Sequence, residues 1–580
     1  MAISPSGRPP SEPRAPARGC PAWLRRAGPA LGIAALALAT TALMLADDLL
    51  QQPFADGNRA DFELSFALGL LAFNAALWLS GSRAFVAGVL ALLAGMELVQ
   101  LGHISYFGRP LDPLALASLF ADFDDVRQVA GTDFAEHWHV PLAVLLPYGA
   151  VLALFMRRLR PGAWPGTALG ARPGARRAVR AAAMTLVLAT LLSKPYRATY
   201  RDINAFLPGP TRNALHNSFN TFGFFAVHGA SLLRADGPPA VAPPPPIVTP
   251  LPSEARHVWL VVSDSLRSDH LGILGYERDT TPRLAARPDL LARHGVASGV
   301  ATAVSLPLIL NAVREPGAVG QIRGLSTNLF RLAKEAGFRT YWISSQESKL
   351  LNDAGSRYID VSVTREDAPE RFLAQGDDAL PALLDEQRWP DKTFVVIVMR
   401  TAHAPYEANY AHDRRYARWP DDRGLPREQR LRNAYDNSVL YFDSVLDRII
   451  ERFDALRGPR HLVATGDHGQ LLGRGGQWGH NVLEPEVATV PVLALSREAA
   501  ADRIGALRDE RWISHFEMSR WLAGALGYRI AYPDELPGVH YVQGKNLYGS
   551  NTFREVREGK ALEFSAVLPV GHRLPAPAAP

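Results

Sequence analysis

The chain has 580 residues, enough for more than one domain and a large core, and 47% of them are hydrophobic. The formal net charge of +5 is a weak signal for nucleic acid, because the arginines gather beside apolar segments, where membrane topology accounts for them. We therefore expect no nucleic-acid partner. The single cysteine, Cys20, excludes an intramolecular disulfide and any cysteine nucleophile or cysteine zinc site in the later part of the chain.

The N-terminal third is predicted to be a membrane domain. Residues 1–28 are rich in proline and arginine and lack apolar periodicity, which is typical of a disordered basic tail. Five apolar segments follow, each close to the ~20 residues that cross a bilayer. They are residues 29–46, 64–80, 84–102, 140–156 and 178–193. A cleavable signal peptide is the alternative for the first segment, but no convincing cleavage site precedes Asp47 and more spans follow.

Arginine placement predicts the orientation of these spans. Arginines precede the first segment, Arg83 lies between the second and third, and seven arginines from Arg157 to Arg180 lie between the fourth and fifth. With five spans, all of these positions fall on one side, which the positive-inside rule makes cytoplasmic. The chain after the fifth segment is then predicted to lie outside.

Two connecting regions lead to a second domain. The acidic loop 103–139 would lie on the outer face, where it could meet a lipid headgroup or be a solvated connector. Residues 194–234 are predicted to form interfacial helices rather than a sixth span. Residues 235–256 are proline-rich, which indicates a semi-rigid linker and a domain boundary.

From residue 257 to residue 580, short β-rich runs alternate with helical ones. Strands are predicted at 258–262, 339–343, 394–399, 461–465 and 490–495, and helices at 325–336 and 429–453. Such alternation predicts an α/β domain with a mostly parallel central sheet that is covered on both faces. Sites in such folds lie at the carboxyl ends of the strands.

Polar side chains gather where these strands end. Asp467 and His468 follow the fourth strand, with His480 on the glycine-rich loop beyond, and Asp264 follows the first strand, with Arg267 close behind. Carboxylate oxygen and imidazole nitrogen both suit Zn²⁺. Each cluster alone also fits a polar turn or a helix cap. Their repetition at several strand ends favours a metal site.

Two further groups complete the predicted site. His403 and Tyr406 follow the third strand and can face the same crevice. Thr302 and Ser305 lie at a predicted helix start, where backbone N–H groups favour phosphate oxygens. Because no cysteine is available, one of these hydroxyls is the candidate nucleophile, and metal coordination can supply the activation that a threonine hydroxyl lacks.

Five motifs carry a resemblance to a known family. They are SDSLRSDHLGILGYERDTTP at 263–282, GVATAVSLP at 299–307, RTAHAPY at 400–406, YDNSVLYFD at 435–443 and GDHGQLLGRGGQWGH at 466–480. With them the chain resembles the membrane-anchored phosphoethanolamine transferases of the alkaline phosphatase superfamily, also called sulfatase-like transferases, over essentially its whole length. The resemblance implies a multi-pass protein of the bacterial inner membrane with a sulfatase-like catalytic domain in the periplasm.

The resemblance also implies roles for the residues at the strand ends. Thr302 is similar to the family's nucleophile. The ligands of one or two Zn²⁺ ions are matched by Asp264, Thr302, Asp467 and His468. His403 and His480 are similar to phosphate-contacting histidines, and Arg267 and Tyr406 are expected substrate contacts. Asp264 stands where the family usually has glutamate, and Gln470 replaces a common acidic residue. Asp112 is the best match in loop 103–139 to the family's lipid-contacting loop.

The implied reaction is a group transfer. Phosphoethanolamine would pass from a membrane phospholipid such as phosphatidylethanolamine, through a covalent phospho-threonine, to a hydroxyl or phosphate of a cell-envelope glycan or lipid A. A sulfatase is disfavoured because no C/S-x-P-x-R element occurs near Thr302. A glycerol-phosphate transferase or phosphodiesterase on the same scaffold, and a non-enzymatic membrane scaffold, stay open as alternatives.

Overall fold

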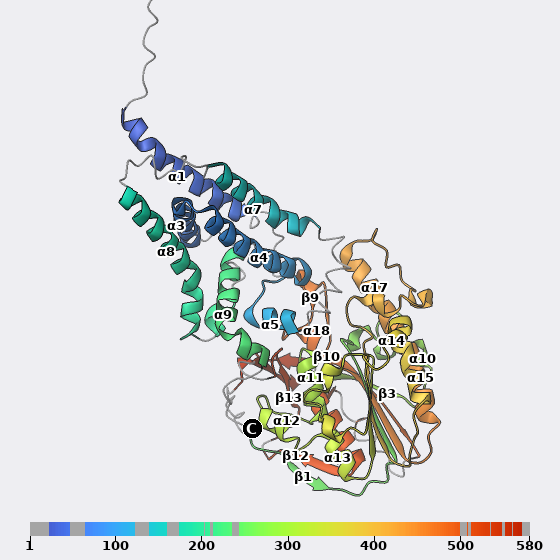
Figure 1. The fold of residues 1–580 in the computed structure, drawn as a ribbon. Helices are drawn as coiled ribbons and strands as arrows, with labels where there is room; N and C mark the ends of the chain where they lie inside the picture. The colour runs from blue at the N-terminus through green and yellow to red at the C-terminus, as the bar shows by residue number, and fades with distance from the viewer. Residues whose placement is uncertain are drawn as a thin grey trace, which may run out of the picture.

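The computed structural model of the chain places a bundle of apolar helices beside an α/β domain (Figure 1). It describes residues 22–46, 64–121, 138–158, 173–201, 203–208, 213–234, 243–498, 507, 512–533, 535–547, 552–559 and 561–570. Most of the predicted tail, the residues 122–137 of the acidic loop and the residues 235–242 of the predicted linker lie outside the described residues.

Helices cover all five predicted spans. The bundle contains α1 (Ala22–Met44), α3 (Leu64–Ser80), α4 (Arg83–Phe107), α5 (Pro113–Ala121), α7 (His139–Arg158), α8 (Pro173–Ala198), η2 (Ile203–Phe206) and α9 (Ala214–Arg234). Among the described helices, α4, α7 and α8 are long and apolar enough to cross a membrane, whereas α3 and the Leu31–Met44 part of α1 are apolar but shorter.

The bundle is apolar both inside and outside. Trp78 of α3 stacks on Phe155 of α7 with ring centroids 3.6 Å apart, at the centre of a buried cluster shared by the helices. Leu68, Leu146 and Leu192 are instead more than half exposed on its outer surface. Large exposed apolar side chains are typical of helices whose outer face meets lipid. The helix α9 packs against α8, α5 and α4, and its predicted place at the membrane interface stays a prediction.

An eight-stranded sheet forms the centre of the α/β domain. Its strands are β2 (His257–Ser263), β3 (Leu291–Val296), β4 (Arg339–Ser344), β5 (Val361–Val363), β6 (Thr393–Met399), β7 (Arg460–Gly466), β10 (Thr489–Arg497) and β11 (Trp512–Ser514). Their order is β11-β3-β10-β7-β2-β6-β4-β5. The strand β10 is antiparallel to β7 and β3, and all other neighbours are parallel. The predicted mostly parallel sheet is therefore confirmed, with one reversed strand.

Helices cover both faces of this sheet, with α17, α15, α14 and α10 on one side and α11 and α13 on the other (Figure 1). The covering helices are α10 (Pro282–Ala285), α11 (Thr302–Leu310), α12 (Val319–Gly324), α13 (Leu329–Glu335), α14 (Pro369–Gln375), α15 (Ala379–Asp385), α16 (Tyr406–Asn409), α17 (Arg427–Asp454), α18 (Pro485–Ala488) and α20 (His515–Leu526). In β2, Trp259 joins one apolar core and Leu260 the other. Successive side chains of a strand point to opposite faces, which explains why an uninterrupted apolar run encodes a central strand.

The helix predicted at 325–336 and the predicted linker differ from the structure at one end each. The helix predicted at 325–336 begins at Leu329, because the Asn328 side chain caps it by accepting the Arg331 N–H. Residues 247–250, near the end of the predicted linker, form β1 (Ile247–Pro250), which pairs with β12 (Tyr528–Ala531). This end of the predicted linker is therefore packed onto the α/β domain.

Smaller elements complete the domain. They are β8 (Leu471–Leu472), β9 (Trp478–Gly479), β13 (Val539–Gln543), β14 (Thr552–Glu558), β15 (Leu562–Phe564) and β16 (Leu568–Pro569), with the short helices η3 (Ser268–His270), η4 (Gly272–Leu274), η5 (Ser348–Leu351), η6 (Ser356–Tyr358), η7 (Gly376–Asp378), η8 (Arg414–Tyr416) and η9 (Arg474–Gly476). The β8–β9 hairpin carries the loop that ends at His480.

Candidate active site

Sheet register brings the predicted metal ligands together. Strands β2 and β7 are parallel neighbours with Ser263 opposite Gly466, so Asp264 and Asp467 leave the sheet side by side. His468 follows, and its Nε2 lies 3.5 Å from Asp467 Oδ2 and 4.0 Å from Asp264 Oδ1. All three side chains are buried, and their ligand atoms lie within 4.8 Å of one another. This group could hold a metal ion.

Local hydrogen bonds orient these carboxylates. The backbone N–H groups of Ser265 and His468 donate to Asp467 Oδ1 at 2.9 Å and 2.7 Å, and the Ser265 hydroxyl donates to Asp264 Oδ1 at 2.7 Å. Ser265 adopts a left-handed backbone (φ 58°) to do this, a conformation that costs a non-glycine residue about 1–2 kcal/mol. The other oxygen, Asp467 Oδ2, has no hydrogen-bond partner among the described residues.

The electrostatics of the group also fit a bound cation. Burial raises the pKa of Asp467 to about 6 against the opposing effect of His468, and the nearby Asp264 carboxylate adds to the rise. Two buried carboxylates at this spacing are unfavourable unless a positive charge compensates them. Two carboxylates, an imidazole and a neighbouring hydroxyl are a donor set that suits Zn²⁺.

Thr302 stands at the edge of this group. It is the first residue of α11, and its Oγ1 lies 3.4 Å from His468 Nε2. Its side chain is only partly buried, whereas Ser305 is fully buried and donates its hydroxyl to the Asp467 carbonyl at 2.5 Å. Residue types alone left both hydroxyls as candidate nucleophiles. The structure favours Thr302, because only its side chain lies beside the ligand group and is also partly exposed.

The two predicted phosphate-contacting histidines lie outside the ligand group. The ring of His480 is centred 4.4 Å from that of His468 and 6.0 Å from that of His403. His403 Nδ1 has no hydrogen-bond partner among the described residues. Burial lowers the pKa of His480 well below its usual value, and His468 and His403 add to the effect, so its imidazole is neutral.

Gln470 connects this region to Tyr406. Its Nε2 donates to the Tyr406 hydroxyl at 2.7 Å, and its Oε1 lies 3.2 Å from His480 Nδ1. Burial raises the pKa of Tyr406 well above its usual value, so the phenol keeps its proton. An acidic residue at position 470 could not donate to Tyr406 unless it were protonated. The neutral amide therefore links the two predicted substrate contacts.

Arg267 is held by Asp269 and the backbone of Gln470. Its guanidinium donates to both carboxylate oxygens of Asp269, at 2.5 Å and 2.8 Å, and to the Gln470 carbonyl at 2.9 Å. A carboxylate two residues along the chain gives a guanidinium a bidentate partner close by. Here Arg267 supports the loop after β7, and its role as a substrate contact stays a prediction.

The carboxyl end of α4 touches the loop that carries His480. Arg109 Nη2 donates to the His480 carbonyl at 2.7 Å. Gly108 has φ +71°, and a side chain there would collide with the Gly476 carbonyl. The Phe107 ring lies against the Cα of Gly479 in the same way. Nothing in the sequence pattern indicated these contacts, because the two segments are 371 residues apart.

Asp112 strengthens the same junction. Its carboxylate pairs with Lys545 at 2.6 Å and also accepts the N–H groups of Leu114 and Ala115 at the start of α5. Although burial opposes it, the Lys545 ammonium holds the pKa of Asp112 below its usual value. Asp112 therefore forms an ion pair between the helical region and the α/β domain, and its likeness to a lipid-contacting loop stays a prediction.

Several known proteins are similar to this chain. Residues 256–528 match the sulfatase family. The Kdo(2)-lipid A phosphoethanolamine 7''-transferase of Salmonella typhimurium is 29% identical over 310 residues, which cover 48% of this chain and 53% of that protein. Phosphoethanolamine transferase EptA of Helicobacter pylori is 26% identical over 254 residues, 41% of this chain and 47% of that protein. The chain thus matches about half the length of these curated relatives.

A solved structure matches more of the chain. The integral membrane protein lipooligosaccharide phosphoethanolamine transferase A from Neisseria meningitidis superposes with a TM-score of 0.55 at 20% identity, covering 86% of this chain and 95% of that chain. Its likeness concerns the fold and confirms an apolar helical region joined to a sulfatase-like domain. The family match, residues 256–528, covers slightly less than half of the chain and shows that this part is similar to the sulfatase family.

Proposed function

We propose that this protein is a metal-dependent phosphoethanolamine transferase of the bacterial inner membrane, with its α/β domain in the periplasm. The observation that carries the proposal is the position of Thr302, whose hydroxyl stands at a helix start beside the group of Asp264, Asp467 and His468. Two relatives that are similar over about half of their length are named phosphoethanolamine transferases, which supports this reaction.

The metal in this proposal is zinc, one ion or two, held by Asp264, Asp467, His468 and Thr302. Asp467 Oδ2 fits a ligand role because it is buried without a hydrogen-bond partner among the described residues. When bound, the ion would lower the pKa of the Thr302 hydroxyl and stabilise negative charge on the phosphoryl group.

The proposed reaction has two displacements. Thr302 Oγ1 attacks the phosphorus of a phospholipid such as phosphatidylethanolamine, the bond from phosphorus to the diacylglycerol oxygen breaks, and diacylglycerol leaves with the proton that Thr302 loses. An oxygen of the acceptor, a hydroxyl or phosphate of a cell-envelope glycan or lipid A, then attacks phosphorus, and Thr302 Oγ1 leaves and regains a proton.

Other residues of the site would bind the phosphoryl group. The first N–H groups of a helix have no partner within it, and those at the start of α11, beside Thr302, could donate to phosphate oxygens. The imidazole of His403 and the neutral imidazole of His480 offer further contacts beside Thr302. Tyr406 and Gln470 would hold His480 in place.

Intact mass and metal content of the full chain in detergent would test the proposal. After incubation with phosphatidylethanolamine, we expect a phosphoethanolamine-sized mass increase on the native protein and on Thr302→Ser, none on Thr302→Ala, and bound zinc in all three. Phosphatidylglycerol serves as the competing donor. An adduct formed only from phosphatidylglycerol would point to glycerol-phosphate transfer, and a protein with neither zinc nor adduct would be a non-enzymatic scaffold.

A further inference from the structure

A charged hollow opens beside the outer histidines. It has a volume of about 380 Å³. Its wall includes Ala404 and Tyr406, which follow His403 in the chain, and Gly479, which precedes His480. Tyr106, from the carboxyl end of α4, closes another side. The hollow therefore lies between the candidate active site and the apolar helical region.

Positive charge is in excess in this wall. Its charged side chains are Arg414, Arg423, Arg427, Arg430, Glu407 and Asp421. Two ion pairs use both carboxylates, because Arg414 contacts Asp421 at 2.8 Å and Arg430 contacts Glu407 at 2.8 Å. Among the described residues of the wall, four guanidinium groups against two carboxylates give an excess of positive charge.

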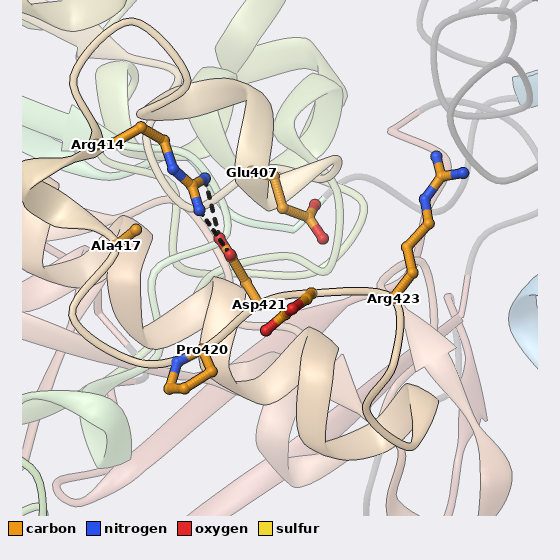
Figure 2. A pocket seen from close by; sticks show the side chains of 7 residues that line it. Glu407, Arg414, Ala417, Pro420, Asp421 and Arg423 are labelled. Atoms are coloured by element: carbon orange, nitrogen blue, oxygen red, sulfur yellow. Dashed lines mark hydrogen bonds and ion pairs between the residues drawn. The ribbon is translucent and has the colours of Figure 1, made fainter.

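Figure 2 shows how these groups lie in an adjoining hollow of about 500 Å³, which shares Glu407, Arg414, Asp421 and Arg423 with the first. In this view Glu407 stands between the Arg414–Asp421 ion pair and Arg423. Arg423 is exposed and forms no ion pair with any described residue. Its guanidinium is therefore available to a ligand that enters the first hollow, whereas the adjoining hollow is also lined by the carboxylate of Asp422.

The deeper part of the wall is fixed by aromatic rings. The guanidinium of Arg427 lies 4.6 Å from the ring centre of Trp478 and 5.9 Å from that of Tyr106. Contacts of this kind hold the planar group in one orientation while its charge still acts on the cavity. Because Tyr106 belongs to α4 and Trp478 to the loop of His480, the hollow depends on both parts of the molecule.

We propose that this hollow binds an anionic group, a phosphate or carboxylate on the sugar of the acceptor glycolipid, and that Arg423 is a specificity-determining residue. This inference rests on the proposed transferase function. Guanidinium groups suit phosphate and carboxylate because two N–H donors face two oxygens. The donor headgroup phosphoethanolamine is zwitterionic, so a net positive hollow favours the acceptor, which is net anionic. The neighbouring apolar helices suit a sugar that is attached to lipid.

Binding to the full chain in detergent micelles would test this site without turnover. The background is Thr302→Ala, and the probes are a glucosamine glycolipid that carries two phosphates and the same glycolipid without them. We expect Arg423→Glu to raise the Kd for the phosphorylated probe about tenfold or more, since it replaces an attractive charge by a repulsive one. Arg415→Glu is the matched control, because Arg415 is 85% exposed and lies outside both hollows.

Three outcomes decide the proposal. Equal binding of the phosphorylated probe to Arg423→Glu and to its parent would overturn it. In proteins with Thr302 intact, a larger change in half-saturation for phosphatidylethanolamine than for the acceptor would assign the hollow to the donor instead and would also overturn it. Selective loss of phosphorylated-probe binding supports the site, even if the native protein forms no adduct with any donor and the proposed function fails.

Discussion

The inner ligand group and the outer histidine pair are built in different ways. The inner group, Asp264, Asp467 and His468, follows two neighbouring parallel strands of the α/β domain and is buried. The outer pair, His403 and His480, lies on loops and is partly exposed. The backbone of His480 is held from outside the domain by Arg109 at the end of α4.

This difference suggests that two tasks of the proposed site, binding the metal and positioning His480, depend on different parts of the molecule. Among the described residues, the hydrogen bonds that orient Asp467 and Asp264 come from the α/β domain, so metal binding should not depend on the helical region. The position of His480 requires α4 as well. Left-handed backbone at Ala402 (φ 78°) and Asn481 (φ 68°), next to the two histidines, shows that the loops hold them against a conformational cost. Mutations can test whether the two tasks are independent.

The largest effect is expected from Asp467→Asn, which removes one carboxylate charge from the inner group. An amide cannot replace the carboxylate charge that a zinc ion requires, so we expect zinc content to fall below about a tenth of the native value and transfer to fall about a thousandfold or more. Metal analysis and the rate of adduct formation measure both. The control is Asp279→Asn, an exposed aspartate that pairs with Arg418. Full zinc content in Asp467→Asn would remove Asp467 from the ligand set.

An intermediate effect is expected from Gly108→Ala, which disturbs the contact between the end of α4 and the loop that ends at His480. The added methyl group would meet the Gly476 carbonyl and is strained at φ +71°, so the loop that ends at His480 must shift. Displacement of a substrate contact by about 1 Å can cost about a hundredfold in rate. We expect adduct formation to slow about 10- to 100-fold while zinc content stays at the native value.

The same helix provides a control for that substitution. Gly102 lies in α4, six residues before Gly108, and a methyl group there meets nothing within 4 Å. Gly102→Ala should therefore behave like the native protein in both measurements. If Gly108→Ala lost zinc together with activity, the inner group would depend on the helical region, and the proposed separation of tasks would be wrong.

The inner group was within reach of sequence reasoning because its geometry follows from local rules. Uninterrupted apolar runs predicted β2 and β7, and polar residues at the ends of parallel strands meet at one edge of the sheet. Residue types alone could not choose between Thr302 and Ser305, since both lie at the start of α11, and only the family resemblance pointed to Thr302. That choice depends on which face of the helix meets the carbonyl of Asp467.

The contacts of the outer histidine pair and of Asp112 could not be predicted from the sequence, for a physical reason. Arg109 and His480, or Asp112 and Lys545, are hundreds of residues apart and meet only where the helical region packs against the α/β domain. No periodicity or motif records such a contact. Arg267 illustrates the same limit on a shorter scale, because its nearest partner, Asp269, competes with any substrate for the guanidinium.

The smallest effect is expected from Ser305→Ala, which tests how the inner group is supported. Its buried hydroxyl donates to the Asp467 carbonyl, and removing it leaves that acceptor unpaired, at a cost of about 1–3 kcal/mol in the free energy of unfolding. Thermal unfolding would measure this loss. The adduct should still form, at a rate within about tenfold of the native one, because Asp467 Oδ1 remains fixed by two backbone N–H groups. If Ser305→Ala instead abolished the adduct while Thr302→Ala kept it, Ser305 would be the nucleophile, and the Thr302 assignment that underlies the comparison would fail.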